Sequence, residues 1–433
     1  MLVKATEDKP VDRYYLVYIT FVILGIVSAM PIRIFISAAS YYAVKLKGTP
    51  YQYAVENYII LAYSLPCPLG STINIFLLRS INVRKRMTFS TIILIISFII
   101  TAILAELDTS KWKGTFIILT IATVAFSSLF GTTVYLSSLH GLSSIFPKEY
   151  SQAVQIGQAV CGVFTAAVNV LSIIVWHSVR HSGVGYFCSG IIILLLALII
   201  QLLLKKNAFA RSYMEKNLEY DVQQKMKQDR DDDQFCSESD EEFDHIEYDK
   251  STIKRVMYIT RKIWPILLAL FLCYIVTHMV YPSITTRVFS IHKESHGPLT
   301  GRLFIPVACF LVYAIADLVG RIISGWILMP NYNQGLSLLF LAACRFILVP
   351  LFIYCNVQPR KHLSVKIHSD VVYIILILVL GLSQGYVKTL TTMYAPKLVH
   401  SRFKEATGAM VYFCITIAYI VSSLMAFGVS AIP

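Results

Sequence analysis

The strongest constraint on the fold of this chain is a set of eleven apolar segments. Each is about long enough to cross a lipid bilayer as a helix. Because 56% of its 433 residues are hydrophobic and only 15% are charged, a water-soluble fold has too little interior to bury them. We therefore predict an all-α polytopic membrane protein with eleven transmembrane helices. The expected helices span about residues 14–36, 56–78, 88–105, 114–138, 151–176, 184–204, 263–284, 302–327, 335–354, 371–394 and 406–430.

The distribution of Lys and Arg indicates the orientation, because membrane proteins concentrate these residues in cytoplasmic loops. With a cytoplasmic N-terminus, eleven Lys and Arg fall on each side, and the loop at 205–262 adds twelve to the inner side. We therefore expect a cytoplasmic N-terminus and an extracytoplasmic C-terminus, with six-helix (1–204) and five-helix (263–433) bundles. The net charge of +13 lies in short runs beside the apolar segments, which favours a lipid bilayer over a nucleic acid as partner.

The loop at 205–262 is expected to be cytoplasmic, acidic and disordered. Its middle, 229–249, contains eleven Asp and Glu residues against one Arg, which is too much charge for a buried core. Ser237 and Ser239 lie among these acids, where an acid-directed kinase would find its preferred context. The favoured interpretation is a solvated linker, and a phosphorylation switch is the alternative.

The apolar segment 304–330 carries two charged residues near its middle, Asp317 and Arg321. A charge at that depth costs about 2.5 to 3.5 kcal/mol, so we expect it to face a water-filled cavity or a partner. Four residues apart, the two side chains share one helix face, together with Gly320. An ionised carboxylate accepts hydrogen bonds from neighbouring hydroxyls and a guanidinium donates to further oxygens, which suits a polyol such as ribose. The alternative is an ion pair that only fixes helix packing.

A second segment, FPKEYSQAVQIGQAVCGVF at 146–164, precedes and forms the fifth expected helix. Gly157 and Gly162 allow a neighbouring backbone or a ligand to approach closely, and Gln158 places an amide in an apolar wall. Considered alone, such glycines are more often packing contacts between helices.

These two segments form a series with CRFILVPLFIYCNVQPRKHL from Cys344, GLSQGYVKTL from Gly381 and KEATGAM from Lys404. In order and spacing the series resembles the equilibrative nucleoside transporter family, solute carrier family 29, and its animal-like branch. The resemblance covers nearly the whole chain. It implies eleven helices in a 6+5 major-facilitator-like arrangement, a central cavity, and alternating access for nucleosides that move down their gradients.

The resemblance also implies roles for individual residues. Asp317 and Arg321 match the ribose-contacting acid and base of helix 8. Arg86, expected before helix 3, and Glu405, at the start of helix 11, match a pair that closes the cytoplasmic side; the alternative is two ordinary loop charges. Ser64 and Cys67, which flank Pro66, fall where helix 2 lines the cavity.

Two departures from the family put base recognition in doubt. Pro31-Ile32-Arg33 stands where the family typically has Pro-Trp-Asn, and Leu136 stands where a base-reading Gln is common. Without that aromatic surface and that amide, we expect broad or weak selectivity for the nucleobase. Arg33 has two interpretations: its side chain snorkels to lipid headgroups, which is favoured, or it enters the outer vestibule and attracts anionic ligands such as nucleotides.

Two residues of the tenth expected helix complete the candidate site. Gln384 is expected to face the cavity, and Lys388 is expected to snorkel toward the inner membrane surface.

The predicted function is facilitated diffusion of nucleosides, with nucleobases as further candidates. Rivals are a proton-coupled carrier that uses Asp317, a carrier of anionic nucleotides, and a non-transporting receptor or scaffold. The adjacent Arg321 favours the ionised carboxylate, which argues against proton coupling. No catalytic motif, cofactor motif or disulfide framework is present, and the histidine pairs 177/181 and 292/296 lack a third metal ligand. We expect the plasma membrane, with an internal membrane as the alternative; the sequence leaves the oligomeric state open.

Overall fold

A computed structural model of the chain describes residues 11–38, 42, 45–49, 55–78, 80–109, 111–175, 182–215, 252–291, 301, 303–358 and 364–430. Within them, eleven helical stretches are long and apolar enough to span a membrane, which confirms the prediction. Six of these stretches lie before residue 205 and five lie after residue 251. Ser237, Ser239 and both predicted histidine pairs lie outside the described residues.

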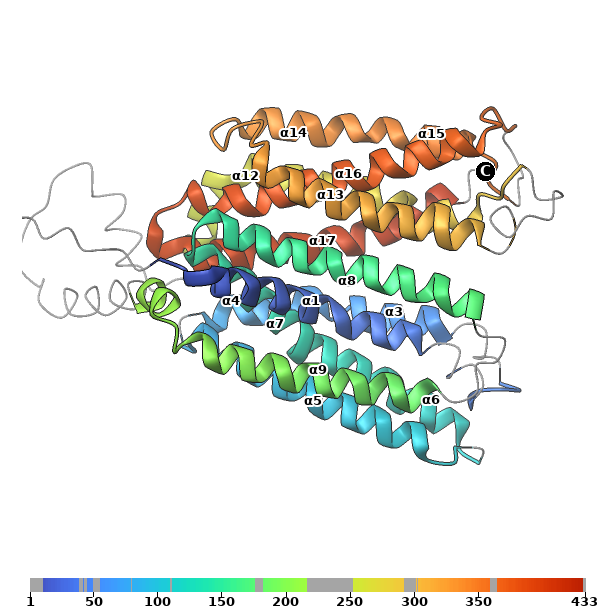
Figure 1. Cartoon of the computed structure of the whole chain (residues 1–433), viewed down its shortest axis with the longest axis horizontal. Helices are drawn as coiled ribbons and strands as arrows, with labels where there is room; N and C mark the ends of the chain where they lie inside the picture. The colour runs from blue at the N-terminus through green and yellow to red at the C-terminus, as the bar shows by residue number, and fades with distance from the viewer. Residues whose placement is uncertain are drawn as a thin grey trace, which may run out of the picture.

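The helices run side by side along the long axis of the molecule (Figure 1). The first six stretches consist of α1 (Leu16–Ser37), α3 (Val55–Ser64) with α4 (Cys67–Leu77), α5 (Val83–Glu106), α6 (Lys113–Phe126) with α7 (Thr133–Ile145), α8 (Lys148–Val175) and α9 (Ser182–Leu204). The last five consist of α12 (Thr252–Val280), α13 (Val312–Trp326), α14 (Gly335–Cys344) with α15 (Leu348–Tyr354), α16 (Asp370–Tyr394) and α17 (Lys404–Ser430).

Several helices extend beyond their apolar segments. Helix α5 begins at Val83 rather than 88, because the Asn82 side chain accepts a hydrogen bond from the Arg84 amide and caps the helix in a charged stretch. Arg86 therefore lies in the first turn of α5 and not in a loop, which corrects the expected position. Likewise, α7 continues to Ile145 and α12 begins at Thr252. Hydropathy marks the lipid-embedded part of a helix, whereas capping decides where the helix begins.

Three spans contain an irregular segment. Pro66, which has no amide hydrogen to donate, separates α3 from α4. A π-helical segment, Ser127–Thr132, joins α6 to α7, and another, Ile305–Leu311, precedes α13. Such irregular segments are common at functional sites. One of them leads directly into the helix that carries Asp317.

Glycines bring two pairs of helices into backbone contact. A Cβ atom added to Gly385 of α16 would overlap the carbonyl oxygen of Asp317, and one added to Gly320 of α13 would overlap that of Leu382. In the same way, a Cβ on Gly157 of α8 would overlap the carbonyl oxygen of Val22 in α1. Small residues permit this approach of membrane helices. The backbone around Asp317 is therefore held by α16.

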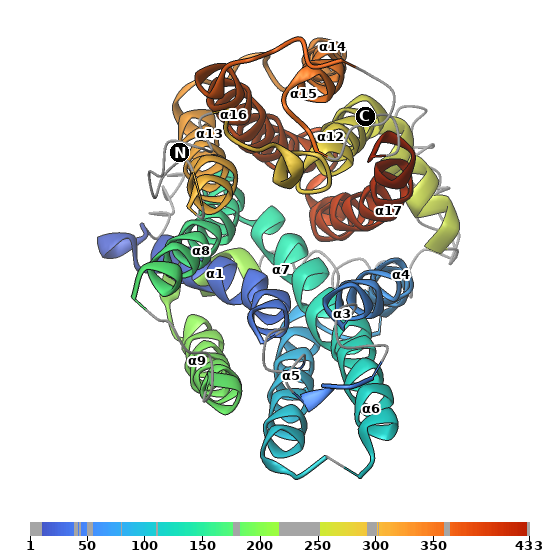
Figure 2. The ribbon, with the colours of Figure 1, turned by 90° about the vertical axis from the view of Figure 1, so that its right-hand side faces the viewer.

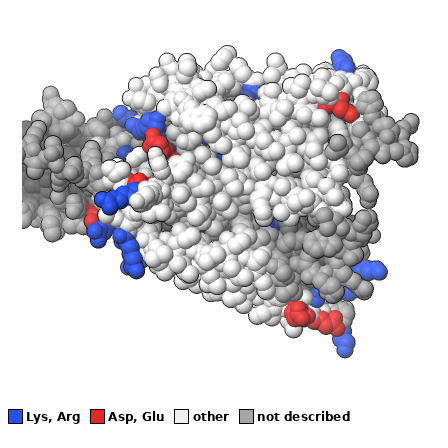
Figure 3. All heavy atoms as spheres, in the orientation of Figure 1, with Lys and Arg blue, Asp and Glu red and all other residues white. Residues whose placement is uncertain are grey.

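Seen from the end at which α17 finishes, α8 lies beside α1 and α13, and α7 lies toward α17 (Figure 2). Charged side chains gather at the two ends of the molecule, and the wall between them is largely uncharged (Figure 3). Large apolar side chains are exposed along this wall, including Phe89, Phe164, Phe340 and Leu424. In a bilayer, such a surface faces lipid.

We predict that Gly385→Ala lowers the thermal stability of the purified protein by about 1 to 3 kcal/mol, because the new methyl group separates α16 from α13. Gly114→Ala is the matched control, since nothing lies within 4 Å of a Cβ added at that helical position. Melting curves in the same detergent measure both variants. Equal melting temperatures for the two would contradict the backbone contact.

Candidate functional site

Asp317 and Arg321 occupy successive turns of α13 and form an ion pair inside the helix bundle. Arg321 Nη2 donates a hydrogen bond to Asp317 Oδ2 at 2.6 Å. The side chain of Asp317 is 9% exposed and that of Arg321 is 7% exposed. A charge pair this deep needs further hydrogen bonds to offset the loss of water. For Arg321, these bonds come from α8.

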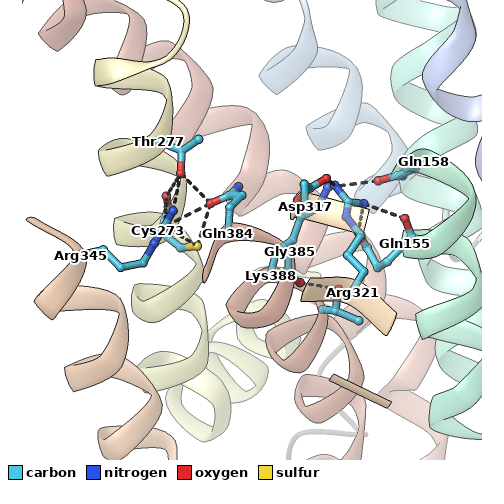
Figure 4. A network of polar contacts seen from close by, with 11 residues as sticks. Gln155, Gln158, Cys273, Thr277, Asp317, Arg321, Arg345, Gln384, Gly385 and Lys388 are labelled. Carbon is cyan, nitrogen blue, oxygen red and sulfur yellow. Dashed lines mark hydrogen bonds and ion pairs between the residues drawn. The ribbon is translucent and has the colours of Figure 1, made fainter. Parts of the chain in front are cut away.

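Two glutamines of α8 hold Arg321 from across the helix interface. Arg321 Nη1 donates to the backbone oxygen of Gln155 at 2.7 Å and to its Oε1 atom at 3.2 Å. Gln152 Nε2 donates to the backbone oxygen of Arg321 at 2.9 Å. Neither residue was predicted from the sequence, although Gln152, Gln155 and Gln158 recur every three residues and so share a helix face. Figure 4 shows Gln155 and Gln158 turned toward Asp317 and Arg321.

Three buried polar atoms around the pair have no hydrogen-bond partner among the described residues: Asp317 Oδ1, Arg321 Nε and Gln155 Nε2. The first is an acceptor and the other two are donors. Leaving such a group unpaired costs about 1 to 3 kcal/mol. A hydroxyl group both donates and accepts hydrogen bonds, so it has the chemistry to pair with any one of these three atoms.

Tyr419 of α17 is an exposed aromatic residue within electrostatic range of the pair. Its ring lies 4.4 Å from that of His278, and the residue interacts electrostatically with Arg33, Asp317 and Arg321. Despite this interior position, Tyr419 is 40% exposed. An exposed aromatic ring offers a stacking surface for a planar group. The sequence analysis did not identify it, because tyrosines are frequent in this chain.

Lys388 points into the molecule, so the prediction that it snorkels to the membrane surface is wrong. The residue is 7% exposed, and its Nζ atom donates a hydrogen bond to Gln158 Oε1 at 3.1 Å. The same atom lies 5.5 Å from the centre of the Tyr274 ring. Gln158 in turn donates from Nε2 to Ser28 Oγ at 3.4 Å. Because α16 packs close to α8, the ammonium group reaches Gln158 inside the molecule.

Arg33 also faces the interior, contrary to the favoured expectation of snorkelling. Its Nη2 atom lies 3.3 Å from the position that a Cβ on Gly162 of α8 would occupy. It interacts electrostatically with Tyr63, Tyr281 and Tyr419, which belong to three other helical stretches. Gly162 therefore makes room for a guanidinium group rather than for a neighbouring backbone.

Gln384 lies apart from the pair, contrary to the expectation that it faces the cavity. Its Oε1 atom accepts hydrogen bonds from Thr277 Oγ1 at 2.7 Å, Cys273 Sγ at 2.9 Å and Arg345 Nη1 at 3.1 Å. Figure 4 shows this cluster on the opposite side of α16 from Asp317. Arg345, 4% exposed, also went unnoticed in the sequence, although a charge inside an apolar segment is the signal that identified Asp317.

Arg86 and Glu405 form an ion pair between α5 and α17 at the end where α5, α8 and α17 begin, which we call the Arg86 end. Arg86 is 2% exposed and also donates from Nη1 to Asn74 Oδ1 at 2.6 Å and to Ser138 Oγ at 3.3 Å. The alternative of two ordinary loop charges does not agree with this burial. Asn74, which orients the guanidinium, was not identified from the sequence.

The remaining candidate residues do not contact the pair directly. Pro31 is buried within α1, and Ile32, Ser64 and Leu136 are half-buried. The Sγ atom of Cys67 lies 3.4 Å from Ser128 Oγ. Among the described residues, no group of three His, Cys, Asp or Glu side chains is placed to hold a metal ion.

Solved transporter structures share the fold at very low sequence identity. The proton:xylose symporter XylE of the major facilitator superfamily superposes with a TM-score of 0.52 at 9% identity, over 96% of this chain and 95% of that chain. A bacterial homologue of the iron transporter ferroportin, in an outward-facing state, gives 0.58 at 10% identity, over 95% and 96% of the two chains. At these identities the likeness shows the fold alone.

Sequence comparisons show the family. Residues 121–431 match the family model described as "Nucleoside transporter". The chain is 31% identical to equilibrative nucleoside transporter 3 of Rattus norvegicus, over 97% of this chain and 90% of the relative. It is 30% identical to equilibrative nucleoside transporter 2 of Homo sapiens, over 94% and 95% of the two chains. The chain therefore belongs to the equilibrative nucleoside transporter family.

Proposed function

We propose that the protein transports nucleosides across a membrane by facilitated diffusion and that Asp317 and Arg321 bind the ribose. The single observation that carries this assignment is the group of unpaired polar atoms on Asp317, Arg321 and Gln155, within a membrane-embedded interface. In this role the two ribose hydroxyls donate to Asp317 Oδ1 and accept from Arg321 Nε and Gln155 Nε2. The nucleoside then compensates polar groups that otherwise remain unsatisfied.

Recognition of the base rests on fewer contacts. Ile32 of α1 stands where the family typically has a tryptophan, and Leu136 of α7 stands where a glutamine is common. Tyr419 supplies an exposed ring near the pair and takes over part of the stacking. A stacking surface accepts every base, since each has a π-face, so nucleobase selectivity is broad.

Transport proceeds by alternating access between two bundles, residues 1–204 and 263–433. The ribose site lies between α8 of the first and α13 of the second, and the ion pair of Arg86 and Glu405 joins the bundles at the Arg86 end. Rocking of one bundle against the other breaks this pair and opens the site to that side. The Arg86 end is cytoplasmic in this proposal, as the positive charge of the 205–262 loop favours.

Asp317→Asn is expected to lower uptake of labelled uridine by about tenfold or more, since it removes a charged acceptor and leaves Arg321 buried without its partner. Uptake is normalised to the amount of protein at the membrane. Glu149→Gln is the control, because that carboxylate is 51% exposed and lies far outside the pair in the first turn of α8. Normal uptake by Asp317→Asn would leave the pair only a packing role.

Opening at the Arg86 end is expected to increase when the gate is weakened. In a protein that carries Ser144→Cys, the added substitution Glu405→Gln should raise the rate at which the new cysteine reacts with a membrane-impermeant maleimide in open membranes. Ser144 is 4% exposed and packs against Gly408 of α17, so the label reaches it only when α7 and α17 separate. The protein without the added cysteine gives the background. An unchanged labelling rate would argue against a gate.

The rival functions separate in the same uptake assay. Facilitated diffusion gives saturable uridine flux that changes little between pH 5.5 and 7.5 and is insensitive to an uncoupler. A proton-coupled carrier loses flux when the uncoupler is added. A receptor or scaffold shows no saturable flux and no effect of Asp317→Ala.

The plasma membrane is the proposed location, with an internal membrane as the alternative. In the linker, Ser237 and Ser239 remain candidate kinase sites, which mass spectrometry of the protein from cells tests directly.

A further inference from the structure

The interior of this transporter carries more positive than negative charge. Among the described residues, Arg321, Arg345 and Lys388 are buried cations away from the Arg86 end, Arg33 is half-buried, and Asp317 is the buried carboxylate that lies among them. Asp317 is already paired with Arg321 at 2.6 Å. The other cations must therefore be stabilised by neutral groups or by a ligand.

Arg345 is stabilised by the protein itself. Its guanidinium donates to Cys273 O and Thr277 Oγ1 at 2.7 Å each, and to Ser383 Oγ at 2.9 Å. It also reaches Gln384 Oε1 and Leu380 O. Every acceptor around it is neutral and fixed, so Arg345 has a structural role and adds positive potential without offering a binding site.

Lys388 is less completely stabilised. An ammonium group has three hydrogens to donate, and in the described part of the chain it makes one hydrogen bond, to Gln158 Oε1. No described carboxylate lies within 4.0 Å of its Nζ atom. The Tyr274 ring offers a cation–π contact, and Asp317 acts on it only at longer range. A buried cation with this environment favours an incoming anion.

Arg33 and Lys388 approach the same face of α8, one turn apart. Arg321 contacts Gln155, Lys388 contacts Gln158, and Arg33 lies against Gly162. These contacts fall on successive turns, so three cations from three different helices line about 10 Å of α8. Lys388 interacts electrostatically with Arg321 and more weakly with Arg33. Arg33 is half-buried and lies toward the solvent-accessible Tyr419.

We propose that this row of cations lets the site accept nucleosides that bear an anionic group, with a nucleoside monophosphate as the further substrate class. The ribose binds at Asp317 and Arg321, and the phosphate lies between Lys388 and Arg33 beside Gln158. A phosphate oxygen accepts charge-assisted hydrogen bonds from both cations and replaces water that the ammonium group lost on burial. This inference rests on the proposed nucleoside site and adds the charge of the substrate to it.

The test uses the purified full-length protein in liposomes, which contain no enzymes that remove phosphate. Uptake of labelled uridine and of labelled uridine 5′-monophosphate is measured in parallel, together with the thermal stabilisation that each compound gives. The wild-type protein is expected to transport the monophosphate in a saturable way. In Lys388→Met, the ratio of monophosphate to uridine uptake should fall about tenfold or more, because a charged hydrogen bond is lost.

Arg33→Met is expected to lower the same ratio, and Lys388→Arg to retain most of it. Lys388→Met removes a buried charge and keeps an extended apolar side chain, so folding should be preserved. Lys397→Met is the matched control, since this exposed lysine lies at the end of the same span, over the Tyr332 ring.

Two results would overturn this inference and leave the nucleoside proposal standing. In the first, the wild-type protein transports uridine but neither transports the monophosphate nor is stabilised by it. In the second, Lys388→Met lowers the uptake of uridine and of the monophosphate equally. Transport of the monophosphate without uridine would support the cationic site and overturn the nucleoside proposal. If neither compound is transported or stabilises the protein, both proposals fail.

Discussion

The free-energy cost of placing charged side chains inside the membrane-spanning helix bundle determines how the interior of this molecule is arranged. A charge in the hydrocarbon region is tolerated only when it is paired, hydrogen-bonded or hydrated. The protein places charged side chains inside its helix bundle and stabilises them with carboxylates or with neutral acceptors. Arg86 pairs with Glu405, Arg321 pairs with Asp317, and Arg345 is surrounded by neutral acceptors. These three arrangements correspond to the proposed gate, the proposed binding site and a structural cluster.

The contrast between Arg345 and Arg321 separates structure from function. The neutral acceptors of Arg345 lie on α12 and α16, so its guanidinium joins these two helices. Arg321 instead reaches across to α8, and atoms beside it remain unpaired among the described residues. Stability alone does not explain such unsatisfied groups, because each one costs free energy. A substrate that hydrogen-bonds to these unpaired atoms gains binding free energy, because it removes the cost of leaving them unpaired.

Helix packing sets the position of these groups. Gly385 and Gly320 bring α16 against α13, and this contact directs both Lys388 and Arg321 toward α8. Gly162 leaves space for the guanidinium of Arg33 on the same α8 face. Small residues thus do more than bring helices together. They decide which charged side chains meet in the interior and which potential a substrate encounters there.

Hydropathy and the helical repeat were enough to predict eleven spans, the depth of Asp317 and its pairing with Arg321, because these depend on residues close in sequence. The inward direction of Arg33 and Lys388, the burial of Gln384 and the contacts of Gln155 depended on which helices are neighbours. The direction of a long side chain follows from the space that other helices leave, and a repeat within one helix carries no information about that space. Local sequence therefore determined which charges enter the membrane, and only tertiary packing decided what each of them binds.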